Sequence, residues 1–203
     1  MIRDTVLEIF GATWPTIIIS MVILVSMRIV YLIKYNKKIV LYEELITLLF
    51  IIYVLCLFYV VTFQDVSWST SNFTPFSEMF RYEIGSRLFI KNVLGNVILF
   101  LPYGFFAAYY LKLKKPWSIL GLSILVSLTI ETTQLLIGRV FDIDDIILNT
   151  IGGLFGFYIY HVLSKINSHL PEILKKPIIY NIIVICLLVL VIVYLVGFIE
   201  IGV

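Results

Sequence analysis

The sequence has little charge and little cysteine, and it lacks the motifs of the common soluble enzymes. Charged residues make up 14% of the 203 residues, and the formal net charge of +2 is too small to suggest a nucleic-acid partner. Cys56 and Cys186 lie in apolar runs, where a thiol behaves as a small hydrophobe, so no disulfide follows from them. There is no P-loop, GxSxG, HExxH or paired Cys/His spacing. These absences remove the usual nucleotide, serine-hydrolase and zinc signatures, and no cofactor is predicted.

Apolar residues dominate what is present. They account for 61% of the chain, the mean hydropathy is +1.06, and several apolar runs reach the roughly 20 residues that a helix needs to cross a bilayer. Because the connections between these runs are short, the sequence predicts a single integral membrane domain, residues 1–203. The fold is expected to be all-α, a polytopic transmembrane helical bundle. Six spans are predicted, at residues 13–34, 43–63, 88–111, 117–137, 146–165 and 178–199.

The distribution of basic residues predicts the orientation in the membrane. Nine lysines fall in three connections, three in each, at residues 34–38, 112–115 and 165–176. The opposite side holds mainly Arg3, Arg81, Arg87, Lys91 and Arg139. Because lysine and arginine favour the cytoplasmic side, both termini are predicted to be extracellular. The first span is expected to be retained, since the preceding residues lack the basic start and small-residue cleavage site of a signal peptide.

The connection at residues 64–87 is the longest polar stretch, and it is rich in aromatic side chains. Its charged residues are interleaved with Trp68, Phe73, Phe76, Met79, Phe80 and Tyr82. Such a mixture favours the membrane interface, so this segment is predicted to be an extracellular interfacial or re-entrant loop. Residues 72–76 read NFTPF, and a turn is expected there because Pro75 restricts Thr74 to extended conformations.

Polar side chains follow one face of the fourth span and one face of the fifth. On the fourth span, helical spacing places on one face Ser123, Ser127, Glu131, Gln134 and Gly138. On the fifth span, the corresponding face holds Asp145, Asn149, Gly152, Gly156 and Tyr160. A carboxylate in an apolar helix costs several kcal/mol unless it is paired or solvated, so we expect the two faces to meet inside the bundle. The GxxxG spacing at residues 152–156 permits close helix approach.

The third span begins with two amides and contains a proline. Asn92 and Asn96 lie one turn apart, beside Lys91. Pro102 cannot donate to the carbonyl of Ile98, so a bend is expected near the middle of the membrane. Together with the fourth and fifth spans, this span places polar groups in the outer half of the bundle.

These polar residues also have structural explanations. Glu131 could form a buried ion pair with Lys91 or Arg139. One of the three aspartates at residues 142–145 is expected to cap the following helix, and the asparagines could serve as interhelical hydrogen-bond partners. The remaining acids could bind a divalent cation, but the spacing of a calcium-binding loop is absent, and no metal site is predicted.

Four segments carry a family resemblance: NFTPF at residues 72–76, NVLGNVILFLPYG at 92–104, ETTQ at 131–134 and RVFDIDDIILNTIGGLFG at 139–156. In this order they resemble the VanZ-like family, named for teicoplanin resistance, over roughly residues 40–165. The resemblance implies a bacterial cell-membrane protein whose relatives reduce susceptibility to glycopeptide antibiotics, lipoglycopeptides especially, without belonging to the pathway that rebuilds the peptidoglycan terminus. The positions that match the family motifs are Asn92, Asn96, Pro102, Gly104, Glu131, Gln134, Arg139, Asp142, Asp145, Asn149, Gly152 and Gly156.

The leading hypothesis is a mixed-charge pocket in the outer halves of the third, fourth and fifth spans, covered by the 64–87 loop and open to the outer leaflet. Its basic groups suit a phosphate or carboxylate, and its acids suit an ammonium, amide or hydroxyl donor. Membrane lipids are the expected partners, with a lipid-linked cell-wall precursor or a lipidated glycopeptide as ligand. The predicted ligand-binding residues are Arg87, Lys91, Asn92, Asn96, Glu131, Gln134, Arg139, Asp142, Asp145 and Asn149.

Two other functions are consistent with the same residues. In an intramembrane enzyme that modifies a lipid or cell-wall precursor, the general base would be Glu131, Asp142 or Asp145. Arg139 would then stabilise developing negative charge, but the absence of a nucleophile motif favours binding over catalysis. In a proton-coupled transporter, Glu131 would carry the proton and Pro102 would serve as a hinge, although no internal repeat indicates alternating halves.

Overall fold

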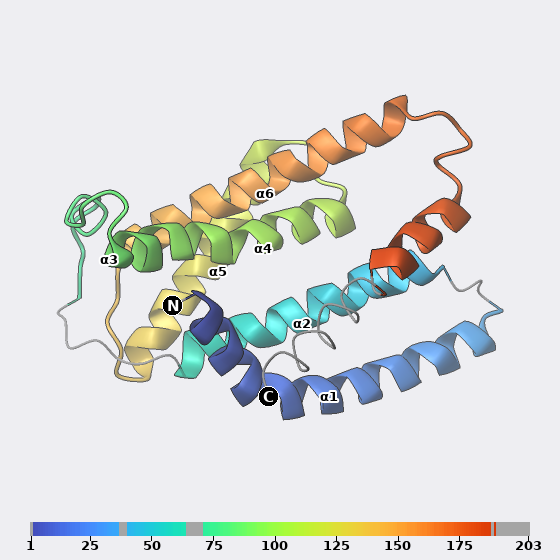
Figure 1. The fold of residues 1–203 in the computed structure, drawn as a ribbon. Coiled ribbons are helices and arrows are strands. Elements are labelled where there is room, and N and C mark those ends of the chain that lie inside the picture. The colour runs from blue at the N-terminus through green and yellow to red at the C-terminus, as the bar shows by residue number, and fades with distance from the viewer. Residues whose placement is uncertain (1, 37–39, 64–70, 188, 190–203) are drawn as a thin grey trace.

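The computed structural model describes residues 2–36, 40–63, 71–187 and 189, and these residues are mostly helical (Figure 1). The long helices are α1 (Ile2–Lys34), α2 (Leu41–Phe63), α4 (Gly95–Leu111), α5 (Pro116–Leu136) and α6 (Ile143–His169). A short helix, α3 (Arg87–Phe89), and a π-helical turn, η1 (Ile90–Leu94), lead directly into α4. The predicted all-α helical bundle is therefore confirmed.

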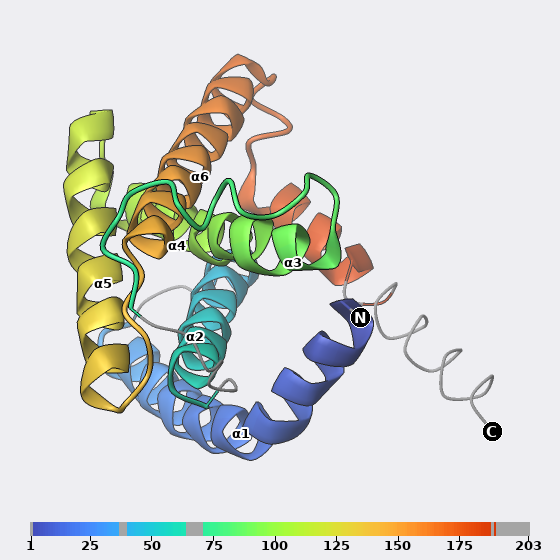
Figure 2. The same ribbon diagram turned by 90° about the vertical axis from the view of Figure 1, so that its left-hand side faces the viewer.

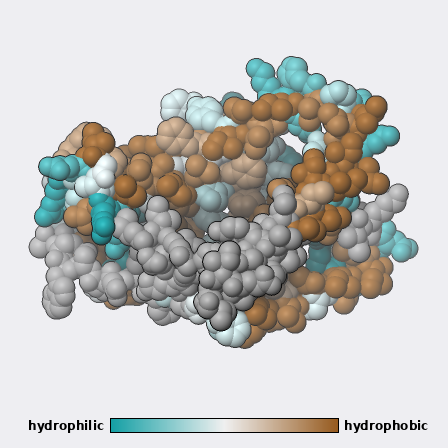
Figure 3. All heavy atoms as spheres, viewed as in Figure 1, coloured by the Kyte–Doolittle hydropathy of each residue, from teal (hydrophilic) through white to brown (hydrophobic). Residues whose placement is uncertain are grey.

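Five of the described helices are long and apolar enough to cross a membrane: Thr13–Lys34, Leu41–Thr62, Arg87–Leu111, Pro116–Leu136 and Ile143–His169. Each coincides with a predicted span to within four residues at either end. The sixth predicted span, residues 178–199, begins as the apolar helix Pro177–Leu187, and nearly all of its remaining residues lie outside the described ones. Hydrophobic side chains lie along the helices, and hydrophilic ones gather toward the ends of the bundle (Figure 3).

Local chemistry fixes where α4, α5 and α6 begin and end. The helix α4 ends at Lys112, which has the left-handed φ of 51°, and α5 starts at Pro116, whose missing N–H is not needed in a first turn. Gly138 follows α5 with a φ of 84° that suits glycine. Asp142 then caps α6, because its carboxylate accepts the N–H of Asp144 at 2.9 Å. The prediction that one aspartate of this triplet is a helix cap is confirmed.

The helix α6 packs against both α4 and α5, and its glycines allow both neighbours to approach closely (Figures 1 and 2). A Cβ atom on Gly152 or Gly156 would overlap backbone carbonyls of α4. A Cβ atom on Gly153 would overlap the Oγ of Ser123, on α5. The predicted glycine-mediated helix packing is therefore present, and the partner of the GxxxG face is α4.

The pair α1–α2 is joined to the remaining helices by aromatic contacts near the end at which α4 stops. The ring of Phe50, on α2, lies 5.0 Å from the ring of Phe106 and 5.4 Å from that of Tyr110, both on α4. The α1–α2 pair is itself held by a bidentate ion pair, in which the Arg28 guanidinium donates to the Glu44 carboxylate at 2.9 Å. The helices α2 and α4 thus pack against each other at this end, and their other ends border the cavity described below.

Gly156→Ala is expected to destabilise the fold. The added methyl group would press against α4, and overpacking of this kind costs about 1–3 kcal/mol. Gly121→Ala is the matched control, because a Cβ atom at Gly121 meets no atom within 4 Å. Thermal unfolding of both variants in detergent compares them directly. A Gly156→Ala midpoint equal to that of Gly121→Ala would contradict the close α4–α6 contact.

Candidate functional site

A cavity of about 680 Å³ lies at the end of the bundle where α4 and α6 begin, which we call the polar end. Its walls come from α2, the loop at residues 72–82, α3, η1, α4, α5, the α5–α6 connection and the start of α6. Val60, Leu99, Phe100 and Leu148 supply an apolar part of the lining. Five carboxylates and three cationic side chains line the rest, together with several amides. This volume falls within the range of small-molecule binding sites.

Nine of the ten predicted ligand-binding residues line this one cavity: Lys91, Asn92, Asn96, Glu131, Gln134, Arg139, Asp142, Asp145 and Asn149. Arg87 is not among the lining residues; it is exposed and begins α3. The cavity also receives Asn72, Glu78, Arg81 and Asp144, which the sequence reasoning did not select. The structure thus brings the polar faces of the third, fourth and fifth spans together, while a role of these residues as ligands stays a prediction.

Glu131 joins the end of α5 to the start of α6. Its side chain is only 2% exposed, and its Oε2 accepts the backbone N–H of Asp142 at 2.8 Å. Within the described part of the chain it forms no ion pair, so a salt bridge to Lys91 or Arg139 is not what holds it. The other carboxylate oxygen, Oε1, accepts no hydrogen bond from the described residues.

Arg139 and Gln134 both reach the last turn of α2. The Nη1 of Arg139 donates to the carbonyl of Val61, and the Nε2 of Gln134 lies 3.5 Å from the same oxygen. The last carbonyls of a helix have no intrahelical donor and carry partial negative charge, so a guanidinium is a favourable partner. Arg139 therefore serves as a C-terminal cap of α2 in addition to lining the cavity.

The π-helical turn before α4 lies next to an amide, Asn96, that contacts α6. In η1 the N–H of Gly95 bonds to the carbonyl of Ile90, five residues earlier, while α4 continues as one helix through Pro102. The Nδ2 of Asn96 donates to the carbonyl of Asn92 at 3.0 Å and also to the Oδ1 of Asp145, on α6. The irregular backbone thus lies beside the cavity, at the position of the predicted polar pair.

Asn149 is the most enclosed amide of the site. It is 3% exposed, and its Nδ2 donates to the Oγ of Ser127, on α5, at 2.8 Å. This contact confirms that the polar faces of α5 and α6 meet. The amide oxygen, Oδ1, is buried and has no hydrogen-bond partner among the described residues. Burial of an unpaired acceptor is unfavourable and calls for a donor.

The NFTPF segment is hydrogen-bonded to the start of α6. The backbone N–H of Asn72 donates to the carbonyl of Phe141 at 2.8 Å, and the N–H of Ile143 donates to the carbonyl of Asn72 at 3.0 Å. The Nδ2 of Asn72 also donates to Asp142 at 2.8 Å. Burial raises the pKa of the Asp142 carboxyl above its ordinary value, against the lowering effect of the hydrogen bonds that the carboxyl accepts from Asp144 and Asn72. The turn predicted at this segment therefore closes one side of the cavity.

Asp144 holds the next part of the loop. Its carboxylate is 1% exposed; Oδ1 accepts the N–H of Phe76, and Oδ2 accepts the N–H groups of Glu78 and Met79 at 2.8 and 3.1 Å. Sequence reasoning missed this residue because three closely spaced acids at the start of a helix resemble capping residues. The sequence did contain a signal for a further role, because a helix cap needs only one carboxylate and three are present.

The sequence of this chain matches a known protein family. The VanZ/LLP1 family model matches residues 50–164, more than half of the chain. The chain belongs to the VanZ/LLP1 family. It is accordingly a membrane protein of a family associated with glycopeptide resistance. No curated protein and no solved structure matches it.

Every residue that lines the cavity lies within the part of the chain that the VanZ/LLP1 model matches. Two helices lie outside that part: α1 and the helix Pro177–Leu187. Across the described ranges of this VanZ/LLP1 protein, no three histidine, cysteine, aspartate or glutamate side chains are grouped to hold one metal ion. The polar side chains that line the cavity are amides, carboxyl groups, lysine, arginine and the hydroxyl-bearing Tyr82.

Proposed function

We propose that this cavity binds the polar part of an amphiphile from the outer leaflet, and that this binding lowers susceptibility to glycopeptide antibiotics. The amphiphile would be a lipid-linked envelope component or a lipidated glycopeptide. The observation that carries the proposal is the cavity itself, which combines about 680 Å³ with mixed charges and an apolar lining inside a bundle of membrane-spanning helices. A polar headgroup with an attached acyl chain matches both parts of such a lining.

The distribution of lysines supports the outer leaflet as the source of this ligand. Lys34, Lys112 and Lys165 lie at the end of the bundle opposite the cavity, and the positive-inside rule assigns that end to the cytoplasm. The polar end then faces the side on which glycopeptides and finished lipid-linked wall precursors are found. The 72–82 loop, held by Asp144, would cover the ligand from that side.

Filling the cavity tests this proposal. Val60→Trp places a large ring in the cavity lining, whereas Val54→Trp, on the same helix, places it at a position that is 43% exposed. In a susceptible host that expresses either variant at the wild-type level, Val60→Trp is expected to lower the minimal inhibitory concentration of teicoplanin toward that of the host alone. Val54→Trp is expected to retain the wild-type value. Equal resistance from both variants would exclude the cavity as the working site.

A further inference from the structure

The free hydrogen-bonding groups in the inner part of the cavity are acceptors. Asn149 Oδ1 is buried without a partner, and the donor of the same amide is already used on Ser127. The Asn96 amide nitrogen likewise donates within the protein, to Asp145 and to the Asn92 carbonyl. The protein therefore offers this region unsatisfied oxygen atoms rather than N–H groups.

Two carboxylate oxygens stand beside this amide. Glu131 uses Oε2 to accept the N–H of Asp142, and Asp145 uses Oδ1 to accept from Asn96. Their second oxygens, Oε1 and Oδ2, receive no hydrogen bond from any residue that the structure describes. Asp145 and Asn149 are four residues apart on α6 and thus share a face. We call the group formed by Glu131, Asp145 and Asn149 the acceptor pocket.

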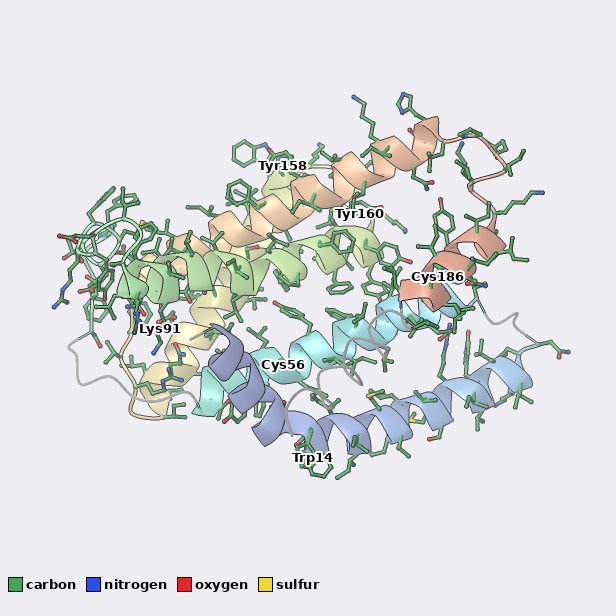
Figure 4. The ribbon with its side chains drawn as sticks, viewed as in Figure 1. Trp14, Cys56, Lys91, Tyr158, Tyr160 and Cys186 are labelled. Atoms are coloured by element: carbon green, nitrogen blue, oxygen red, sulfur yellow. The ribbon has the colours of Figure 1, made fainter. Side chains whose placement is uncertain are left out.

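The cations lie nearer the polar end. Arg81 pairs with Glu78 at 3.0 Å, and Arg139 donates to the α2 carbonyl, so both are engaged. Lys91 has neither an ion pair nor a hydrogen bond with the rest of the described chain, and it lies at the polar end of the bundle (Figure 4). It lies in η1, about one turn nearer the polar end than Asn96. A free cation thus stands above the acceptor pocket.

We propose that the bound amphiphile carries a primary ammonium group that enters the acceptor pocket, with an anionic group above it facing Lys91. This inference rests on the proposed function and names the chemistry of its ligand. A primary ammonium has three N–H donors and no acceptor, and the acceptor pocket offers three free oxygens. A trimethylammonium group has no donor, and a purely anionic headgroup would face the carboxylates of Glu131 and Asp145.

Two sources can supply this chemistry: a phospholipid with an ethanolamine headgroup and the amine of a lipidated glycopeptide. The whole chain, purified in detergent, is titrated with short-chain phosphatidylethanolamine, phosphatidylcholine and phosphatidylglycerol of identical acyl chains, with binding followed by native mass spectrometry. The ethanolamine lipid is expected to bind about tenfold tighter than the other two, the effect of one good buried hydrogen bond. Teicoplanin and N-acetylated teicoplanin form the second arm, in which acetylation is expected to weaken binding if the antibiotic is the source.

Variants of the acceptor pocket give the inference a residue-level test. Asn149→Leu is expected to abolish the preference for an amine-bearing probe, because it removes the free acceptor. Asn149→Asp keeps an acceptor and is expected to retain the preference. Asn167→Leu makes the same substitution at an exposed position of α6 outside the cavity, and it is the control that is expected to bind like wild type.

The outcomes separate this inference from the proposed function. Equal binding of the three lipids and of both forms of teicoplanin would overturn the ammonium group while leaving amphiphile binding in place. Stronger binding of phosphatidylglycerol would also overturn it. Binding of none of the probes would overturn both statements. An unchanged preference in Asn149→Leu would remove Asn149 from the recognition of the ammonium group.

Discussion

Glu131→Gln is expected to abolish the resistance that this protein confers, returning the minimal inhibitory concentration of teicoplanin to that of the host without it. The substitution keeps the size of the side chain, and the glutamine oxygen can still accept the N–H of Asp142. What is lost is the free oxygen Oε1 at a site that is 2% exposed, and what is gained is an NH₂ donor where a ligand donor should sit. The loss of function is therefore expected without loss of the fold.

Two measurements accompany this prediction. Thermal unfolding and expression level are compared with wild type, so that an unfolded variant is recognised. Glu172→Gln removes a carboxylate that is 89% exposed and lies outside the cavity, and it is expected to leave resistance unchanged. Wild-type resistance from a well-folded Glu131→Gln protein would show that this residue only joins α5 to α6.

The sequence predicted the helices well because the membrane imposes their length and composition. Backbone groups in a bilayer must be satisfied within the helix, so each apolar run of about 20 residues has only one available structure. The polar faces of α5 and α6 were also predictable, since burying Glu131 and Asn149 required that they point inward. The contact between Asn149 and Ser127 confirms this reasoning.

The specific partners within the cavity were not predictable, because they depend on how distant segments dock. Arg139 was expected to serve as a ligand-binding cation, and its bond to the Val61 carbonyl depends on where α2 ends in space. Arg87 was expected in the same site, but it begins α3, and the irregular turn η1 that follows brings the next basic residue, Lys91, to the cavity instead. Charge and spacing alone do not distinguish these two positions.

The four acids of the ETTQ and DIDD segments make different contacts in the structure. Asp142 caps α6 and binds Asn72, Asp144 holds the loop backbone, and Asp145 with Glu131 keeps a free oxygen toward the cavity. The loop and Glu131 are both bonded to the start of α6. Asp144 accepts the loop N–H groups, and the N–H of Asp142 donates to Glu131. Perturbing the residue that holds the loop should therefore affect both stability and binding.

Asp144→Asn is expected to destabilise the protein by about 3 kcal/mol, because charge-assisted hydrogen bonds to three backbone N–H groups are disturbed. Both carboxylate oxygens accept from the loop, so an asparagine places its NH₂ group against N–H donors whichever way the amide is turned. We expect a lower midpoint of thermal unfolding. We also expect faster cleavage by trypsin after Arg81, which lies in the loop that Asp144 holds.

Glu83→Gln is the matched control for Asp144→Asn, because it makes the same chemical change at an exposed carboxylate of the same loop. It is expected to leave the midpoint and the cleavage rate unchanged. If Asp144→Asn also behaves like wild type, the loop is not held by this carboxylate. If only cleavage accelerates, the loop opens locally while the helices keep their packing, and resistance should then fall because the cavity loses the wall formed by residues 72–82.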